Sequence, residues 1–187
     1  MNTIRIPHGL RELFGEESTP AELSVVSGFA VVSTVAAMWT TGNEWLGLGT
    51  FAAILIALLM VDIYGGVIAN LSVGTNRYYG HSKKRRLIFI AVHVQPMLFA
   101  LIEGDHMGPA VIVWAFTMVS ALLGDGLRGR SIQRMIGLML GIVGVLIVYS
   151  GASGAPMYMR ATLMMYVVKV IYSFSVDHYA ASDTSAP

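Results

Sequence analysis

The chain has 187 residues, of which 55% are hydrophobic and 12% are charged, and its formal net charge is +1. Charged residues make up roughly 25% of an average soluble domain, so this chain cannot cover a soluble core with polar surface, and lipid is the expected solvent for most of it. The sequence contains no cysteine, which excludes disulfides, thiolate nucleophiles and cysteine-based zinc or iron–sulfur sites.

Residues 1–22 are polar, and six apolar runs follow them. The polar segment lacks the apolar core of a signal peptide, and residues 8–17 (HGLRELFGEE) predict a short amphipathic helix on the membrane surface. Most of the apolar runs approach the ~20 residues that cross ~30 Å of hydrocarbon. Because backbone groups cannot remain unpaired in lipid, we expect these runs to be helices. They cover residues 23–41, 46–71, 87–102, 109–123, 132–149 and 157–176.

Lysine and arginine residues indicate the orientation. They gather in the connections between the second and third runs and between the fourth and fifth runs, and the other connections contain none. Arg160, near the start of the sixth run, is the exception. The positive-inside rule therefore places both termini in the cytoplasm. The two basic groups are Arg77, Lys83, Lys84, Arg85 and Arg86, and then Arg128, Arg130 and Arg134.

The predicted fold is all-α: a polytopic integral membrane protein with a six-transmembrane-helix bundle. We expect a polar cytoplasmic segment at 1–22, the transmembrane domain at 23–178 and a disordered cytoplasmic tail at 179–187. The connections between the runs are too short to hold a soluble domain.

The second apolar run contains an unusual polar pattern. Asp62, Gly66 and Asn70 are four residues apart within the stretch MVDIYGGVIAN, so a helix presents all three on one face. An ionisable residue at such a position costs roughly 2.5–3.5 kcal/mol on insertion scales, which makes it a candidate functional residue.

Polar residues of three different runs are expected at similar depths. At 1.5 Å per residue, Asp62 lies about 15 Å from the inner boundary, and His93, Gln95 and Lys169 lie about 10 Å from it. Pro96 is expected to bend the third helix and free a carbonyl group. We refer to these residues, together with Asn70 near the inner boundary, as the polar set: Asp62, Asn70, His93, Gln95 and Lys169.

The polar set has a structural and a functional interpretation. In the structural one, Asp62 and Lys169 form a buried ion pair that fixes helix packing, and the other members hydrogen-bond across helices. In the functional one, the set lines a cavity open to the cytoplasm. There Asp62 carries a proton or binds a cation, and His93 changes charge near neutral pH.

The basic segment that follows the second run has two interpretations as well. Basic residues beside a membrane usually contact anionic lipid headgroups, at about 1 kcal/mol each. The alternative is capture of a phosphate or carboxylate substrate. The residues concerned are Arg77, Lys83, Lys84, Arg85 and Arg86.

Other sequence features are less specific. Gly137, Gly141 and Gly144 form a small-residue ridge that predicts close helix packing or the seam of a homo-oligomer. Only one of the five histidines, His93, is expected in the membrane interior, so no metal site is predicted. No cofactor is indicated, and the basic stretch at 126–134 is too short and too close to the bilayer to predict nucleic-acid binding.

The sequence leaves three functions open. The first is a transporter or channel for an ion or small solute, with the polar set lining its route. The second is a membrane-embedded enzyme that acts on a lipid or isoprenoid headgroup, with His93 as acid or base and Asp62 orienting it. The third is a non-catalytic accessory or scaffold subunit of a membrane complex. The first has a slight edge, although the lack of polar residues in the outer half weakens it, because this favours a one-sided cavity and hence the second function.

Overall fold

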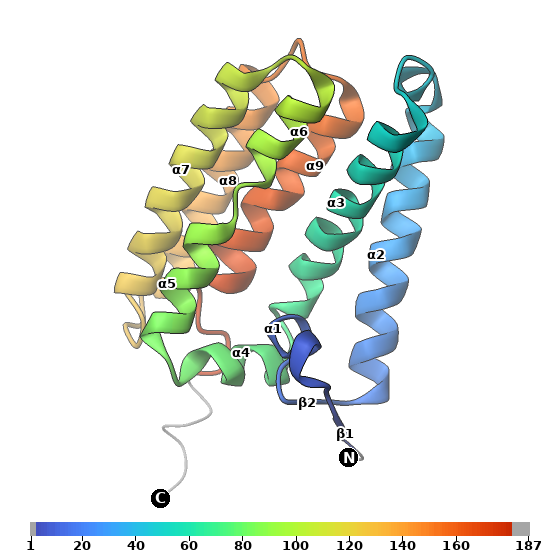
Figure 1. The fold of residues 1–187 in the computed structure, drawn as a ribbon. Coiled ribbons are helices and arrows are strands. Elements are labelled where there is room, and N and C mark those ends of the chain that lie inside the picture. Colours follow the sequence, from blue (N-terminus) through green and yellow to red (C-terminus); the bar gives the residue numbers. More distant parts are fainter. Residues whose placement is uncertain (1–2, 181–187) are drawn as a thin grey trace, which may run out of the picture.

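The computed structural model of the protein describes residues 3–180, most of which belong to helices that run up and down one bundle (Figure 1). An N-terminal segment precedes the bundle, and short elements connect its helices. The N-terminal segment contains β1 (Ile4–Arg5), η1 (His8–Leu10), α1 (Arg11–Phe14) and β2 (Glu17–Ser18). The bundle contains α2 (Pro20–Thr40), α3 (Thr50–Ala69), α5 (Lys83–Val92), α6 (Gln95–Glu103), α7 (Met107–Gly126), α8 (Gln133–Gly151), α9 (Met157–Val167) and η3 (Val168–Phe174). The connecting elements are η2 (Gly42–Trp45) and α4 (Val73–Gly80).

Within the described residues, five helices are long and apolar enough to cross a membrane, which indicates a multipass membrane protein. These are α2, α3, α5 together with α6, α7 and α8. A further helical segment continues from α9 into the wider π-helical turns of η3 and is not among the five; we call it the central pass. Polar residues such as Arg160 and Lys169 lower its hydropathy. The helical prediction for the six apolar runs is confirmed, and the third run is divided between α5 and α6.

The central pass packs against several other helices of the bundle. Helices α3, α7 and α8 contact both α9 and η3, and α6 contacts α9. Tyr158, Leu163 and Ile171 are fully buried. Because protein rather than lipid surrounds this pass, its polar side chains can find partners inside the bundle.

The N-terminal segment differs from the predicted surface helix. Helix α1 has only one turn, and Gly15 directly after it has a φ of 74°, which few other residues adopt. The strands on either side form a short antiparallel ladder that pairs Ile4 with Ser18 and Arg5 with Glu17. The polar connection after α3 begins with α4, which Ser72 caps by accepting from the Thr75 amide at 3.3 Å.

Helix α4 holds the N-terminal segment against the bundle. The Thr75 hydroxyl donates to the Leu13 carbonyl at 3.0 Å, and the Tyr79 hydroxyl donates to the Glu12 carbonyl at 3.2 Å. The N-terminal segment and α4 therefore share one end of the bundle (Figure 1). We call it the basic end, because Arg77 and the lysines and arginines that begin α5 lie there.

The residues after η3 return to the same end. Gln133 Nε2 donates to the carbonyls of Gly124 at 2.9 Å and Ser175 at 3.0 Å, and Gln133 Oε1 accepts from the Asp177 amide at 3.2 Å. The Tyr179 hydroxyl donates to the Leu71 carbonyl at 2.8 Å. Tyr179 is thus packed against the bundle, and residues 181–187 of the predicted tail lie outside the described residues.

The glycine ridge of α8 packs against other segments of the same chain. All three ridge glycines are buried, and a Cβ at Gly144 would lie 2.6 Å from Val167 Cγ1 and 2.9 Å from the Phe116 ring. A Cβ at Gly137 would approach Val176 more closely than 3 Å. Gly137 and Gly144 therefore let α8 approach the chain segment around the central pass. The homo-oligomer seam of Gly137, Gly141 and Gly144 stays a prediction.

Two positions of this ridge provide a matched test of packing. We predict that Gly144→Ala lowers the free energy of unfolding by about 1–3 kcal/mol, because the added methyl group overpacks the contact with Val167. Gly141→Ala is the control, because the nearest atom to its Cβ, Tyr172 Cβ, is 3.9 Å away. Thermal unfolding in detergent measures both variants, and an equal loss in the two would contradict this packing.

Burial makes His178 a pH-dependent element of the C-terminal segment. Desolvation lowers the pKa of its imidazole below the ordinary value of 6.5, although its hydrogen bond to the Tyr172 carbonyl opposes the shift. The unfolded chain therefore binds this proton more readily, and stability decreases as the pH falls below about 6.5. We predict that lowering the pH from about 7.5 to about 5.5 decreases the melting temperature less in His178→Gln than in wild type. An identical decrease in both proteins would exclude this contribution.

Candidate functional site

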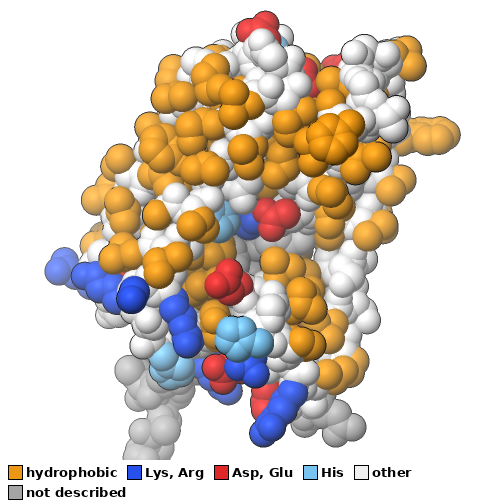
Figure 2. Space-filling view, viewed as in Figure 1, with side chains coloured by type: hydrophobic (Ala, Val, Ile, Leu, Met, Phe, Trp, Pro, Cys, Tyr) orange, Lys and Arg blue, Asp and Glu red, His pale blue; other side chains and the backbone are white. Residues whose placement is uncertain are grey.

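A cavity of about 280 Å³ opens beside α3 and α5 toward the basic end. In the space-filling view, acidic, basic and histidine side chains lie in a hollow beneath a largely apolar surface (Figure 2). Ile88 and Val92, two exposed apolar residues of α5, line it, so the cavity also reaches the side of the bundle. All five members of the polar set line this cavity: Asp62, Asn70, His93, Gln95 and Lys169.

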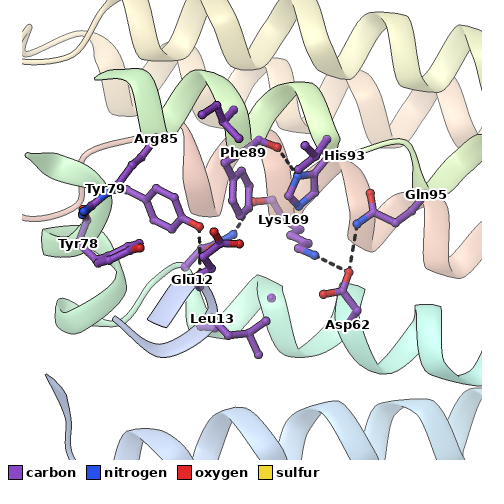
Figure 3. Close-up of a pocket in the computed structure, with 15 residues that line it drawn as sticks. Glu12, Leu13, Asp62, Tyr78, Tyr79, Arg85, Phe89, His93, Gln95 and Lys169 are labelled. Carbon is purple, nitrogen blue, oxygen red and sulfur yellow. Dashed lines mark hydrogen bonds and ion pairs between the residues drawn. The ribbon is translucent and has the colours of Figure 1, made fainter. Parts of the chain in front are cut away.

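An ion pair between the central pass and α3 lies in the cavity (Figure 3). Lys169 Nζ donates to Asp62 Oδ2 at 2.8 Å, and Gln95 Nε2 donates to the same oxygen at 3.1 Å. The Lys169 side chain is 4% exposed and the Asp62 side chain is 37% exposed. The ammonium group is therefore held inside the protein, while the carboxylate remains accessible from the cavity.

Gly66 provides the space in which the Lys169 side chain crosses α3. A Cβ at this position would lie closer than 3 Å to Cδ, Cε and Nζ of the lysine. One turn further along the same helix face, Asn70 Nδ2 donates to the Lys169 carbonyl at 3.4 Å. The spacing of Asp62, Gly66 and Asn70 thus matches the path of a single side chain of the central pass.

The third apolar run is broken where it meets this ion pair. Helix α5 ends at Val92 and α6 begins at Gln95, and His93 between them has a ψ of 71°. Pro96 has no amide hydrogen and occupies the first turn of α6, where none is needed. The predicted bend is therefore a full interruption of the helix. The His93 carbonyl does not face the cavity unpaired, because the Tyr166 hydroxyl donates to it at 2.7 Å.

The contacts of His93 define its tautomer. Its ring lies 3.9 Å from the Phe89 ring, which in turn stacks on Phe174 at 3.6 Å. Nδ1 faces the Phe89 carbonyl. Since a carbonyl only accepts, Nδ1 carries the proton, and neutral His93 keeps Nε2 as a bare acceptor. Across residues 3–180, no side chain or backbone group bonds to this Nε2.

The predicted headgroup contacts separate into two groups. Arg86 differs from the prediction, because it is buried, pairs with Asp125 of α7 and donates to the carbonyls of Tyr79 and Gly80. It joins α4, α5 and α7. The other four side chains are exposed, and Arg85 also lines the cavity with its guanidinium 4.4 Å from the Tyr78 ring centre. The exposed four are Arg77, Lys83, Lys84 and Arg85.

Sequence reasoning missed several residues of the site. Glu12 and Leu13 of α1 line the cavity, and no local pattern places this distant segment there. Tyr166 lies three residues before Lys169 on the same helix face, and this spacing was a signal that could have identified it. Asp125, the partner of Arg86, ends an apolar run and is indistinguishable from a solvated boundary residue.

The described residues contain no group of three or more histidine, cysteine, aspartate or glutamate side chains suited to a metal ion. The five apolar helices and the polar cavity among them are features of a helical multipass membrane protein. Comparisons with protein-family models, with curated proteins and with solved structures found no match to this chain. The site must therefore be interpreted from its own chemistry.

The unequal burial of the ion pair predicts unequal effects of removing each partner. Asp62→Asn leaves the buried Lys169 ammonium without its counter-charge and should cost on the order of 3 kcal/mol of stability. Lys169→Met should cost less, because Asp62 is accessible to water. The double variant Asp62→Asn with Lys169→Met should recover most of the stability that Asp62→Asn alone loses. Thermal unfolding in detergent of the four proteins measures the coupling, and additive effects would contradict a coupled pair.

Proposed function

We propose that the protein is an integral membrane transporter for an ion or small solute, with six transmembrane helices and both termini in the cytoplasm. The observation that carries this proposal is the Asp62–Lys169 ion pair in a cavity beside the interrupted helix α5–α6. An ionisable pair at membrane depth is expensive for the protein and usually marks a functional pathway.

The direction of the helices supports six spans. The sixth pass, Met157–Phe174, runs from the end opposite α4 back to the basic end, alongside the five apolar helices (Figure 1). Central burial accounts for its polar residues without removing it from the membrane. The N-terminal segment, α4 and residues 175–180 share the basic end, and under the positive-inside rule this is the cytoplasmic end.

The shape of the site supports transport. Membrane transporters often bind substrates where a helix is interrupted, since unwound backbone is tolerated at membrane depth only inside protein or beside a water-filled cavity. The other half of the bundle is closed by packed side chains, among which Ile56, Phe99 and Met159 are fully buried. A cavity open toward one side is the arrangement expected of one state in an alternating-access cycle.

One observation favours a membrane-embedded enzyme as the second candidate. The cavity reaches the side of the bundle at Ile88 and Val92, so a lipid headgroup could enter from the bilayer and meet the free Nε2 of His93. In that function His93 would act as general base. Turnover of a lipid by wild type that persists in His93→Gln would exclude this role.

Uptake into proteoliposomes tests the transport proposal. The probes are isotope-labelled sodium, rubidium, ethanolamine, acetate and phosphate. We predict that wild type takes up at least one probe and that the paired variant Asp62→Asn with Lys169→Met, in which no charge is left unpaired, reduces this flux at least about tenfold. Gly141→Ala is the folded control and should retain it. Absence of uptake of every probe by folded wild type, or equal flux in the paired variant, would contradict the proposal.

A further inference from the structure

The cavity atoms that lack partners are hydrogen-bond acceptors. Lys169 and Gln95 both donate to Oδ2 of Asp62, so Oδ1 has no donor among residues 3–180. The Gln95 oxygen Oε1 is buried and has no partner in the same range. Its orientation follows from the amide nitrogen, which must face the carboxylate to donate. With Nε2 of His93, the site presents three acceptors without donors, and a ligand that completes it must donate hydrogen bonds.

The accessible charge at the floor of the cavity is negative. Asp62 and Glu12 line the cavity, and Figure 3 shows them on either side of Lys169. Lys169 and Arg85 balance these carboxylates formally. However, the Lys169 side chain is only 4% exposed and is bonded to Asp62, whereas the carboxylate is 37% exposed. An entering ion therefore meets the carboxylate more directly than the ammonium group.

An ammonium group matches the free atoms better than a metal ion does. It carries three N–H donors, and Asp62 and His93, which both line the cavity, offer it the free acceptors Oδ1 and Nε2. Alkali and alkaline-earth ions prefer a shell of oxygen ligands, which an imidazole nitrogen does not supply.

We infer that the cavity binds the primary ammonium group of a small organic cation, and that this group competes with Lys169 for the Asp62 carboxylate. In the structure described here, Lys169 Nζ occupies the carboxylate oxygen Oδ2 and acts as an internal substitute for the ligand. Only the statement that the bound cation is transported rests on the proposed function. Binding can be tested separately.

Two sources can supply this chemistry. A cavity of about 280 Å³ accommodates a free small amine. The opening beside Ile88 and Val92 also admits the headgroup of an aminophospholipid from the bilayer. Both sources present the same ammonium group to Asp62.

The test measures binding of ethanolamine to the purified full-length chain in detergent, from the concentration dependence of the melting temperature at constant ionic strength. Ethylene glycol and glycolate are the control ligands, in which a hydroxyl and a carboxylate, respectively, replace the ammonium group. We expect a saturable shift with ethanolamine alone. The apparent Kd should be at least about tenfold lower in Lys169→Met, because the internal competitor is gone. The paired variant Asp62→Asn with Lys169→Met should show no saturable shift.

The sign of the Lys169→Met effect decides the inference. Loss of the ethanolamine shift in a folded Lys169→Met variant would overturn it, because the lysine would then be part of the binding site. Stabilisation by glycolate in place of ethanolamine would also overturn it. Because Gly141→Ala lies outside the cavity, it should behave as wild type.

A lipid arm identifies the source of the ammonium group. The comparison is between phosphatidylcholine nanodiscs with and without phosphatidylethanolamine. A higher apparent Kd for ethanolamine in the presence of phosphatidylethanolamine supports the lipid headgroup as the source, and an unchanged Kd supports a free amine.

Failure of the proposed function is distinguishable from failure of this inference. Binding of ethanolamine without its uptake contradicts transport alone, whereas uptake of acetate or phosphate without ethanolamine binding contradicts the cation inference alone.

Discussion

Burial of the Lys169 ammonium group is the constraint on which the rest of the site depends. A cation removed from water in an apolar bundle requires a counter-charge and room for its side chain. Asp62 supplies the charge at 2.8 Å, and Gly66 supplies the room. Both belong to one face of α3, so the central pass and α3 are joined at the level of the cavity.

The interrupted third pass follows from the same constraint. Gln95, the first residue of α6, donates to the Asp62 oxygen that Lys169 also uses. An unbroken helix would require an amide hydrogen at Pro96 and would clash with the preceding turn. The break turns the His93 carbonyl to Tyr166 of α9, three residues before Lys169 in the central pass. Ion pair, break and central helix therefore form one connected arrangement of three elements.

Much of the fold could be predicted from the sequence, because hydropathy and charge are local properties. The six apolar runs, the approximate level of the polar set and the effect of Pro96 follow from residue type and position along each helix. The third helix is longer than its apolar run of residues 87–102, because α5 begins at Lys83 within the basic segment.

Contacts between distant segments could not be predicted in the same way. Nothing local shows that Arg86 turns inward to Asp125 while neighbouring Arg85 stays exposed, since both have similar surroundings in the sequence. Glu12 reaches the cavity only because Tyr79 and Thr75 hold α1 against α4. Likewise, the glycine ridge of α8 predicts close packing but not its partner, and the structure assigns that partner to the central pass.

Accessibility of the cavity floor to water from the cytoplasmic side is the central claim. The absence of cysteine from the sequence allows a single introduced thiol to be followed. In sealed vesicles of known orientation, a charged methanethiosulfonate reagent should modify Gln95→Cys from the cytoplasmic side only. Leu98→Cys, one turn further along α6 at an exposed apolar position, should remain unmodified. Failure of the reagent to reach Gln95→Cys from the cytoplasmic side, or modification from the opposite side, would contradict the account.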